Sequence, residues 1–94
     1  MPYIRIVHND ALDRGSYEAV SRAIDIEHRH PLGLLLHAAG EVDGRWEVVN
    51  VWESREYAER FDRESLKPTM NSLTSDGFQS REITDFEVEH LVTP

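Results

Sequence analysis

The spacing of apolar and polar positions predicts four β-strands. Residues 2–8 are rich in β-branched and aromatic residues and precede the turn-forming pair Asn9-Asp10. Residues 34–41 and 46–53 are apolar runs on either side of Asp43-Gly44, a dipeptide that favours a tight hairpin because both turn residues adopt positive φ. Residues 81–92 alternate as in a half-exposed strand, with one face formed by Phe86, Val88, His90 and Val92.

Helical spacing predicts a first helix from Ser16 to about Arg29. Four residues fall on one stripe of this helix, namely Tyr17, Val20, Ile24 and His28. Pro31 and Gly33 follow and end the helix. The stripe is expected to face the sheet.

A second helix is expected from Arg55, with Ser54 as its capping residue. Its apolar positions fall on nearly opposite sides of a straight helix, one set being Tyr57, Ala58 and Phe61 and the other Leu66, Met70 and Leu73. Pro68 disfavours helical geometry in the residue before it and suits a first helical position. We therefore expect a break near Lys67 and a separate short turn, closed by Asp76-Gly77.

The resulting order, βαββαβ, predicts a single α+β domain over residues 1–94 with a ferredoxin-like arrangement. In this arrangement two helices lie on one face of a four-stranded antiparallel sheet. The two middle strands are apolar on both sides, which is typical of strands that are covered on both faces. A second copy of the chain is the simplest cover, so we expect the fold to pair into a dimeric α+β barrel.

The type of hairpin turn decides which side chains share a face of the sheet. A two-residue loop at Asp43-Gly44 places His37 opposite Asn50 and Leu35 opposite Trp52, so that His37, Asn50 and Trp52 lie on one face. A three-residue loop with a bulge shifts the register by one residue and moves His37 to the other face. The sequence leaves both possibilities open.

Composition narrows the class of protein. The 94 residues carry 10 Lys and Arg against 18 Asp and Glu, a formal net charge of −8, which disfavours nucleic acid and anionic membranes as partners. Apolar runs are too short to cross a bilayer, so a soluble cytoplasmic protein is expected. Without cysteine, the groups that titrate near neutral pH are histidines and carboxylates.

The run Val51-Trp-Glu-Ser-Arg-Glu-Tyr-Ala-Glu-Arg-Phe61, placed after the third strand, resembles the dimeric α+β barrel superfamily. This superfamily contains the antibiotic biosynthesis monooxygenases and the haem-degrading monooxygenases. The segment Gly33–Gly40, followed by Asp43-Gly44, resembles a branch of small uncharacterised bacterial proteins. The resemblance implies a homodimer whose sheets pack face to face, with a ligand cavity between the helices and the sheet of each subunit.

Departures from the haem-degrading members disfavour haem. In those members a tryptophan of the third strand, matched here by Trp52, is paired with an asparagine on the first strand and a haem-ligating histidine on the second helix. This chain has no histidine between His37 and His90. At the end of the first strand the nearest polar residues are His8 and Asn9. We therefore expect no cofactor.

His37 and Asn50 are the candidate catalytic residues. An imidazole titrates near neutral pH and suits a general base, and a carboxamide can hydrogen-bond a developing oxyanion. The candidate substrate contacts are Trp52, His28, Tyr57 and His8. The alternative is structural: His37 and Asn50 satisfy each other inside a core, and the aromatic residues only pack. No metal site is expected, because His28 and His30 are two residues apart and cannot face the same way on a helix.

These residues and the resemblance favour a cofactor-independent monooxygenase that acts on a small aromatic or polycyclic compound. The alternative is a non-catalytic homodimer that binds a small ligand or assists another protein. Fold alone does not decide between them.

Overall fold

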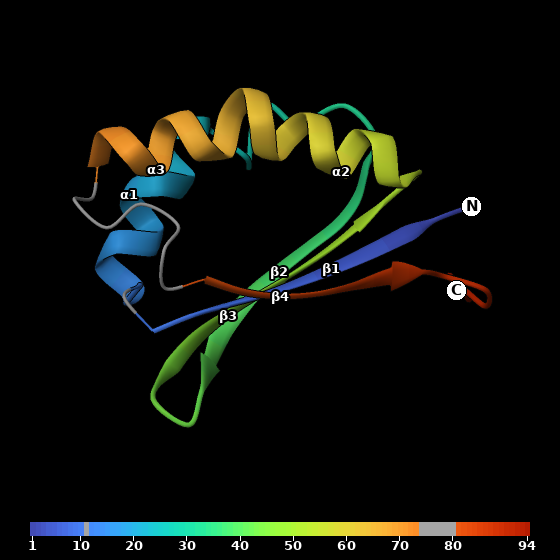
Figure 1. The fold of residues 1–94 in the computed structure, drawn as a ribbon, viewed down its shortest axis with the longest axis horizontal. Coiled ribbons are helices and arrows are strands. Elements are labelled where there is room, and N and C mark those ends of the chain that lie inside the picture. Colours follow the sequence, from blue (N-terminus) through green and yellow to red (C-terminus); the bar gives the residue numbers. More distant parts are fainter. Residues whose placement is uncertain (11, 74–80) are drawn as a thin grey trace.

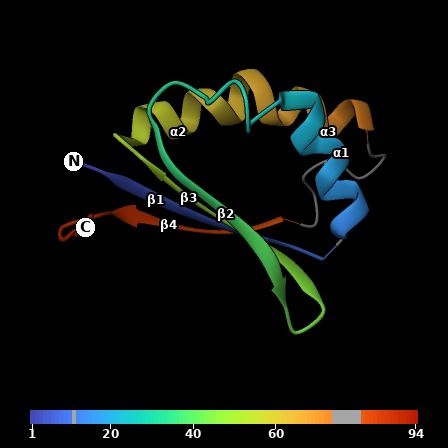
Figure 2. The same ribbon diagram turned by 180° about the vertical axis from the view of Figure 1, so that it is seen from behind.

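Four strands form one antiparallel sheet in the order β2-β3-β1-β4, and the helices lie together on one of its faces (Figures 1 and 2). The computed structural model describes residues 1–10, 12–73 and 81–94. The strands are β1 (Tyr3–Asn9), β2 (Leu34–Val42), β3 (Arg45–Trp52) and β4 (Arg81–Glu87). The helical elements are α1 (Arg14–Ile24), α2 (Arg55–Phe61), η1 (Asp62–Leu66) and α3 (Lys67–Leu73). This is the ferredoxin-like arrangement that the sequence predicted. Among the described residues, no helix is long and apolar enough to span a membrane.

The β2–β3 hairpin has the two-residue turn. Asp43 and Gly44 both adopt positive φ, at 50° and 79°, and Val42 lies opposite Arg45. His37 therefore lies opposite Asn50, which excludes the shifted register. The predicted pair of Leu35 and Trp52 is wrong, because a bulge at Leu35 places Leu34 opposite Trp52 instead.

Helix α1 begins and ends earlier than the sequence predicted. Asp13 is the N-cap, and its side chain accepts a hydrogen bond of 2.7 Å from the backbone N–H of Ser16. At the other end Asp25 adopts the left-handed conformation, with φ 60° and ψ 48°, and its N–H is donated to the carbonyl of Ser21. The predicted extension to Arg29 is therefore wrong, and His28 lies outside the helix.

The second helical segment shifts its face through a π-helical turn and does not break at Lys67. Figure 1 shows α2, η1 and α3 following one continuous path over the sheet. The i→i+5 hydrogen bonds of η1 insert one extra residue, which rotates the following residues by about 100°. Phe61, Leu66 and Met70 consequently all line the same cavity. The predicted closing turn at Asp76-Gly77 lies outside the described residues.

Strand β4 ends at Glu87, five residues earlier than predicted. Its partner β1 begins at Tyr3, which lies opposite Glu87. One further hydrogen bond, of 2.8 Å, runs from the N–H of Val88 to the carbonyl of Pro2. Beyond this point the ladder has no strand residue to pair with, so the alternation of residues 88–92 does not form a strand.

Residues that lie opposite each other form rows across the sheet. On the face beneath the helices, one row is wholly polar and runs from β2 to β4 through His37, Asn50, Arg5 and Asp85. We call the other face the open face; its apolar residues are Ile4, Ile6, Leu36, Ala38, Val49, Val51 and Phe86. Leu36 and Phe86 are each 51% exposed there.

A small core lies where α2 meets the sheet. Its fully buried members are Tyr3, Trp52 and Ala58, and the ring of Phe61 packs on that of Trp52 with centroids 5.2 Å apart. Tyr57 packs beside them against Gly33, whose backbone approaches so closely that a Cβ there would lie 2.3 Å from the Tyr57 ring.

Candidate functional site

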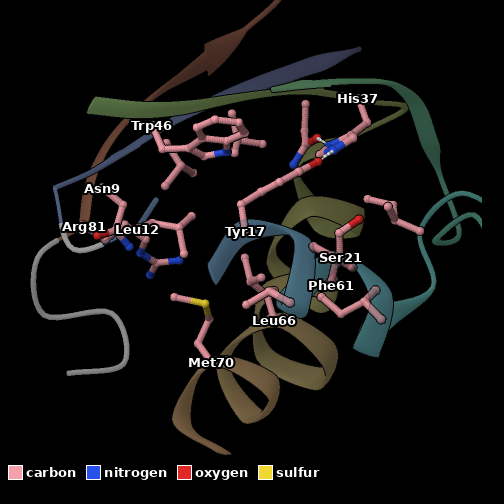
Figure 3. A pocket seen from close by; sticks show the side chains of 16 residues that line it. Asn9, Leu12, Tyr17, Ser21, His37, Trp46, Phe61, Leu66, Met70 and Arg81 are labelled. Carbon is pink, nitrogen blue, oxygen red and sulfur yellow. Dashed lines mark hydrogen bonds between the residues drawn. The ribbon is translucent and has the colours of Figure 1, made fainter. Parts of the chain in front are cut away.

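A cavity of about 70 Å³ lies between the helices and the sheet, along α1 and beside Met70 of α3 (Figure 3). All four strands supply residues to one wall, and α1, α2, η1 and α3 supply residues to the other. Most of the lining is apolar, and the apolar residues are Val7, Leu12, Val20, Ile24, Ile26, Val48, Phe61, Leu66 and Met70. The polar and aromatic residues are Asn9, Tyr17, Ser21, His37, Trp46, Asn50 and Arg81. A mainly apolar wall with a few polar groups is typical of a small-molecule site.

Three side chains in this cavity form a hydrogen-bonded chain. The Tyr17 hydroxyl lies 2.5 Å from His37 Nε2, and His37 Nδ1 lies 2.6 Å from Asn50 Oδ1 (Figure 3). Tyr17 extends from α1 toward the sheet, while His37 and Asn50 project from the neighbouring strands β2 and β3 (Figure 3). The rings of Tyr17 and His37 are nearly parallel, at 9°.

The hydrogen-bond partners determine where the protons lie when Tyr17 and His37 are both neutral. Asn50 Oδ1 can only accept, so His37 carries its proton on Nδ1 and donates it there. His37 Nε2 is then an acceptor, and the Tyr17 hydroxyl donates to it. Burial raises the pKa of the Tyr17 phenol above its ordinary value of 10, with the nearby charge of Glu27 acting in the same direction. Tyr17 is therefore a neutral donor at pH 7.

Next to these three side chains, the polar row of the sheet continues with an ion pair. Arg5 lies opposite Asn50, and its guanidinium is 2.9 Å from the carboxylate of Asp85. The Tyr3 hydroxyl donates to the same carboxylate. That hydrogen bond and the Arg5 charge hold the pKa of Asp85 below its ordinary 3.8, against the opposing effect of burial.

His37 also borders two outer hollows. One, of about 490 Å³, lies beside the end of α1 and shares Tyr17, Ser21, Ile26 and His37 with the cavity. The other, of about 340 Å³, lies beside the start of β2 and shares Ile26 and His37. Ile26 and His37 thus border the inner cavity and both outer hollows.

Trp52 and Tyr57 do not line the cavity of His37, and that part of the prediction is wrong. Trp52 does share the helix-side face with His37 and Asn50, but it is 1% exposed and belongs to the core under α2. Tyr57 packs on Gly33 and lines a separate hollow of about 180 Å³ with residues of α2 and η1. Both side chains face the core, because α2 crosses that end of the sheet.

His28 lies on the surface, and the prediction that it faces the sheet is wrong. Its side chain is 78% exposed, because α1 ends at Ile24 and His28 belongs to the turns that follow. The ring Nδ1 is 2.9 Å from the Asp25 carboxylate, a hydrogen bond that raises the pKa of His28. His28 reaches only the outer hollow of about 490 Å³.

His8 points to the open face and does not line the cavity of His37, and its role as a substrate contact stays a prediction. Alternation along β1 places His8 opposite Glu47 and Glu82 on the neighbouring strands. The neighbouring residue Asn9 is the one that faces the cavity, and it is 3% exposed.

Sequence reasoning did not identify two aromatic residues of the site, Tyr17 and Trp46. Tyr17 was placed on the buried stripe of the first helix, but nothing in the spacing indicated which strand residue its hydroxyl would meet. Trp46 could have been found from its register, since it lies two and four residues before Val48 and Asn50 and so on the same face. In the described ranges, no group of three histidine or acidic side chains is arranged to hold a metal ion.

No protein-family model matches the sequence, and a comparison with curated proteins returns no match. Solved structures do match. Rv0793 from Mycobacterium tuberculosis aligns with a TM-score of 0.70 at 14% identity, over 99% of this chain and 100% of that one. A Nitrosomonas europaea protein assigned to the antibiotic biosynthesis monooxygenases aligns with a TM-score of 0.65 at 15% identity, over 94% and 99%.

SnoaB, a cofactor-independent oxygenase from Streptomyces nogalater, also aligns over nearly the whole of both chains. Its TM-score is 0.65 at 14% identity, with 99% of this chain and 97% of that chain covered. Identities in this range establish the fold and leave the reaction to be argued from the site. The chain has the ferredoxin-like α+β fold of the antibiotic biosynthesis monooxygenase structures.

Proposed function

We propose that the protein binds a small aromatic compound in the cavity between helices and sheet and oxidises it with molecular oxygen, without a cofactor. The observation that carries this proposal is the chain of hydrogen bonds from Tyr17 through His37 to Asn50 at one end of a mainly apolar cavity. The similarity in fold to a cofactor-independent oxygenase supports it.

The size of the cavity indicates how a ligand would lie. An enclosed cavity of about 150 Å³ holds a benzene ring, whereas the inner cavity here measures about 70 Å³. An aromatic ligand therefore extends past Ile26 and His37 into the outer hollow of about 490 Å³. Its ionisable group would then lie beside Tyr17 and His37, which border both spaces.

The hydrogen-bonded chain can remove a proton from such a ligand. A phenolic or carbon acid of the substrate gives its proton to the Tyr17 oxygen while the Tyr17 proton moves to His37 Nε2. The imidazolium that forms keeps its Nδ1–H directed at Asn50 Oδ1, which stabilises it. In this assignment His37 is the base, Tyr17 is the group that touches the substrate, and Asn50 is a positioning residue. The predicted role of Asn50 as oxyanion donor is thereby replaced.

The substrate anion then supplies the electrons for oxygen. It transfers one electron to O₂, and the two radicals combine to form a C–O bond. The resulting peroxide takes a proton back from His37 and loses water to leave a carbonyl group. One substrate and one O₂ thus give one quinone-type product and one H₂O.

We also propose that a second copy of the chain covers the open face. This face presents seven apolar side chains in adjacent rows, and Leu36 and Phe86, each 51% exposed, lie in the same row. Burial of such a surface is the usual driving force for a permanent dimer.

Oxygen uptake by the purified protein, stripped of metal and flavin, tests the catalytic proposal. With 1-naphthol or anthrone as substrate, His37→Ala should lower the rate about a hundredfold or more. Tyr17→Phe should lower it comparably, and the double variant should be no slower than either, because the two residues act as one unit. His30→Ala is the matched control, since the His30 ring is hydrogen-bonded to the carbonyl of Glu27 and His30 lies outside the cavity.

A second function, ligand binding without turnover, is favoured by one observation. Both ring nitrogens of His37 already have partners within the chain, as they would in a purely structural network. If these compounds quench tryptophan fluorescence but oxygen is not consumed, the binding function replaces the catalytic one.

A further inference from the structure

One polar group in the cavity has no partner among the described residues. The indole Nε1 of Trp46 is buried and makes no hydrogen bond there, although the residue lines the cavity and is only 7% exposed. An indole nitrogen is solely a donor, and leaving a buried donor unpaired is costly. Such groups in native proteins call for a specific explanation.

The surroundings of Trp46 direct this donor toward the cavity. Its ring lies against Tyr17, with centroids 5.1 Å apart, and its nitrogen is on the edge turned away from the sheet toward Tyr17 (Figure 3). Asn9 and Arg81 lie in the same row of the sheet and line the same end of the cavity. Both of these already have interactions within the protein, Arg81 with Asp62 at 2.7 Å.

We propose that the Trp46 indole N–H recognises a carbonyl-type oxygen of the ligand and so determines the specificity of the cavity. This inference rests on the proposed function, in that it assumes an aromatic ligand in the cavity. The ligand would then carry two features: an ionisable group beside Tyr17 and His37, and a hydrogen-bond acceptor beside Trp46. Anthrones carry both features, an acidic carbon and a carbonyl oxygen. Aromatic ketones carry the acceptor alone, and aromatic hydrocarbons lack it.

A matched pair of probes isolates the acceptor. 1-Tetralone and tetralin share one ring skeleton and differ in a carbonyl against a methylene group. Calorimetry with the intact protein should give a tetralone-to-tetralin affinity ratio that falls about tenfold in Trp46→Phe, which keeps an aromatic ring and removes the donor. Trp52→Phe is the control and should keep the wild-type ratio, because Trp52 does not line the cavity.

A measurement on the unmodified protein guards against misfolding of the variant. The chain has two tryptophans, so its indole N–H resonances can be assigned with the Trp52→Phe variant. The Trp46 resonance should move downfield with tetralone and should not with tetralin. If both probes bind but neither the ratio nor the resonance distinguishes them, the role of Trp46 is overturned while the cavity remains a binding site. If neither probe binds, the proposed function fails and the inference fails with it.

Discussion

At the scale of single residues, two glycines with positive φ meet different surroundings. Gly33 has φ 84°, and a Cβ there would lie 2.3 Å from the Tyr57 ring; Gly44 has φ 79° with nothing within 4 Å. Gly44→Ala should therefore lower the free energy of unfolding by the conformational cost alone, about 1–2 kcal/mol. Gly33→Ala should cost more, because Tyr57 must also move. Urea unfolding of both variants checks this. Equal losses of unfolding free energy would show that Tyr57 moves aside at no energetic cost.

The pH dependence of stability should report on Asp85. Its folded pKa is depressed by the hydrogen bond from Tyr3 and by the Arg5 charge, so it stabilises the fold above its unfolded pKa near 3.8. This contribution is lost as the pH falls through the folded pKa. Urea unfolding should thus show Asp85→Asn to be less stable than the wild type at pH 7. The difference in unfolding free energy between the two proteins should disappear below pH 3.8. A difference that does not change with pH would show that Tyr3 and Arg5 do not lower the pKa of Asp85.

The residues of the site were predictable to different degrees. The pairing of His37 with Asn50 followed from the Asp43-Gly44 turn, because a two-residue hairpin fixes every later pair along the ladder. The position of Trp52 on the same face was also predictable, but its separation from the cavity was not. That separation depends on where α2 crosses the sheet, which is a property of packing between distant segments and leaves no mark in local spacing.

At the scale of elements, the π-helical turn η1 reconciles two apolar stripes and accommodates Pro68. Pro68 cannot donate to the carbonyl of Glu64, four residues earlier, and Glu64 lies within the turn. Deleting the exposed residue Arg63 should convert the segment to a regular helix, in which Leu66 falls four residues after Phe61 and still faces the sheet.

The deletion is therefore expected to depend on Pro68. On its own it should cost about 3 kcal/mol, because a proline then lies inside a regular helix. Combined with Pro68→Ala, the deletion should regain most of this loss in thermal and urea unfolding. Pro68→Ala in the full-length chain is the control. A double variant as unstable as the deletion alone would mean that the turn is required for another reason.

The ends of elements were the least predictable part of the fold. The sequence spacing predicted that the helical stripe of α1 continues to His28, since Asp25 gives no strong signal for a helix end. Asp25 adopts the left-handed conformation in the folded chain and ends the helix there. The phase conflict after Phe61 was recognised correctly, yet a break and a π-helical turn both resolve it. Sequence spacing alone cannot distinguish them.

At the scale of the whole molecule, the open face predicts assembly. Light scattering at low micromolar concentration should give a mass twice that of the 10.9 kDa chain. Phe86→Glu introduces a charge into the open face and should shift the mass toward that of a single chain. Leu32→Glu is the matched control, because Leu32 is 66% exposed but lies outside that face. A stable, well-folded monomer of the wild-type chain would rule out the dimer.

The neighbouring positions of β1 and β4 bear on how the protein could be rebuilt by engineering. Pro2 and Val88 are joined by a hydrogen bond, and both chain ends lie on the same side of the molecule (Figure 1). A short peptide could therefore connect the two ends while the chain is opened at Asp43-Gly44, so that synthesis would start with β3. The permuted protein would make Asn50 before Tyr17 and His37, yet the same strands would remain neighbours. Ligand binding by such a permutant would show that the cavity requires these strands to be neighbours in the sheet and does not require them to be synthesised in the natural order.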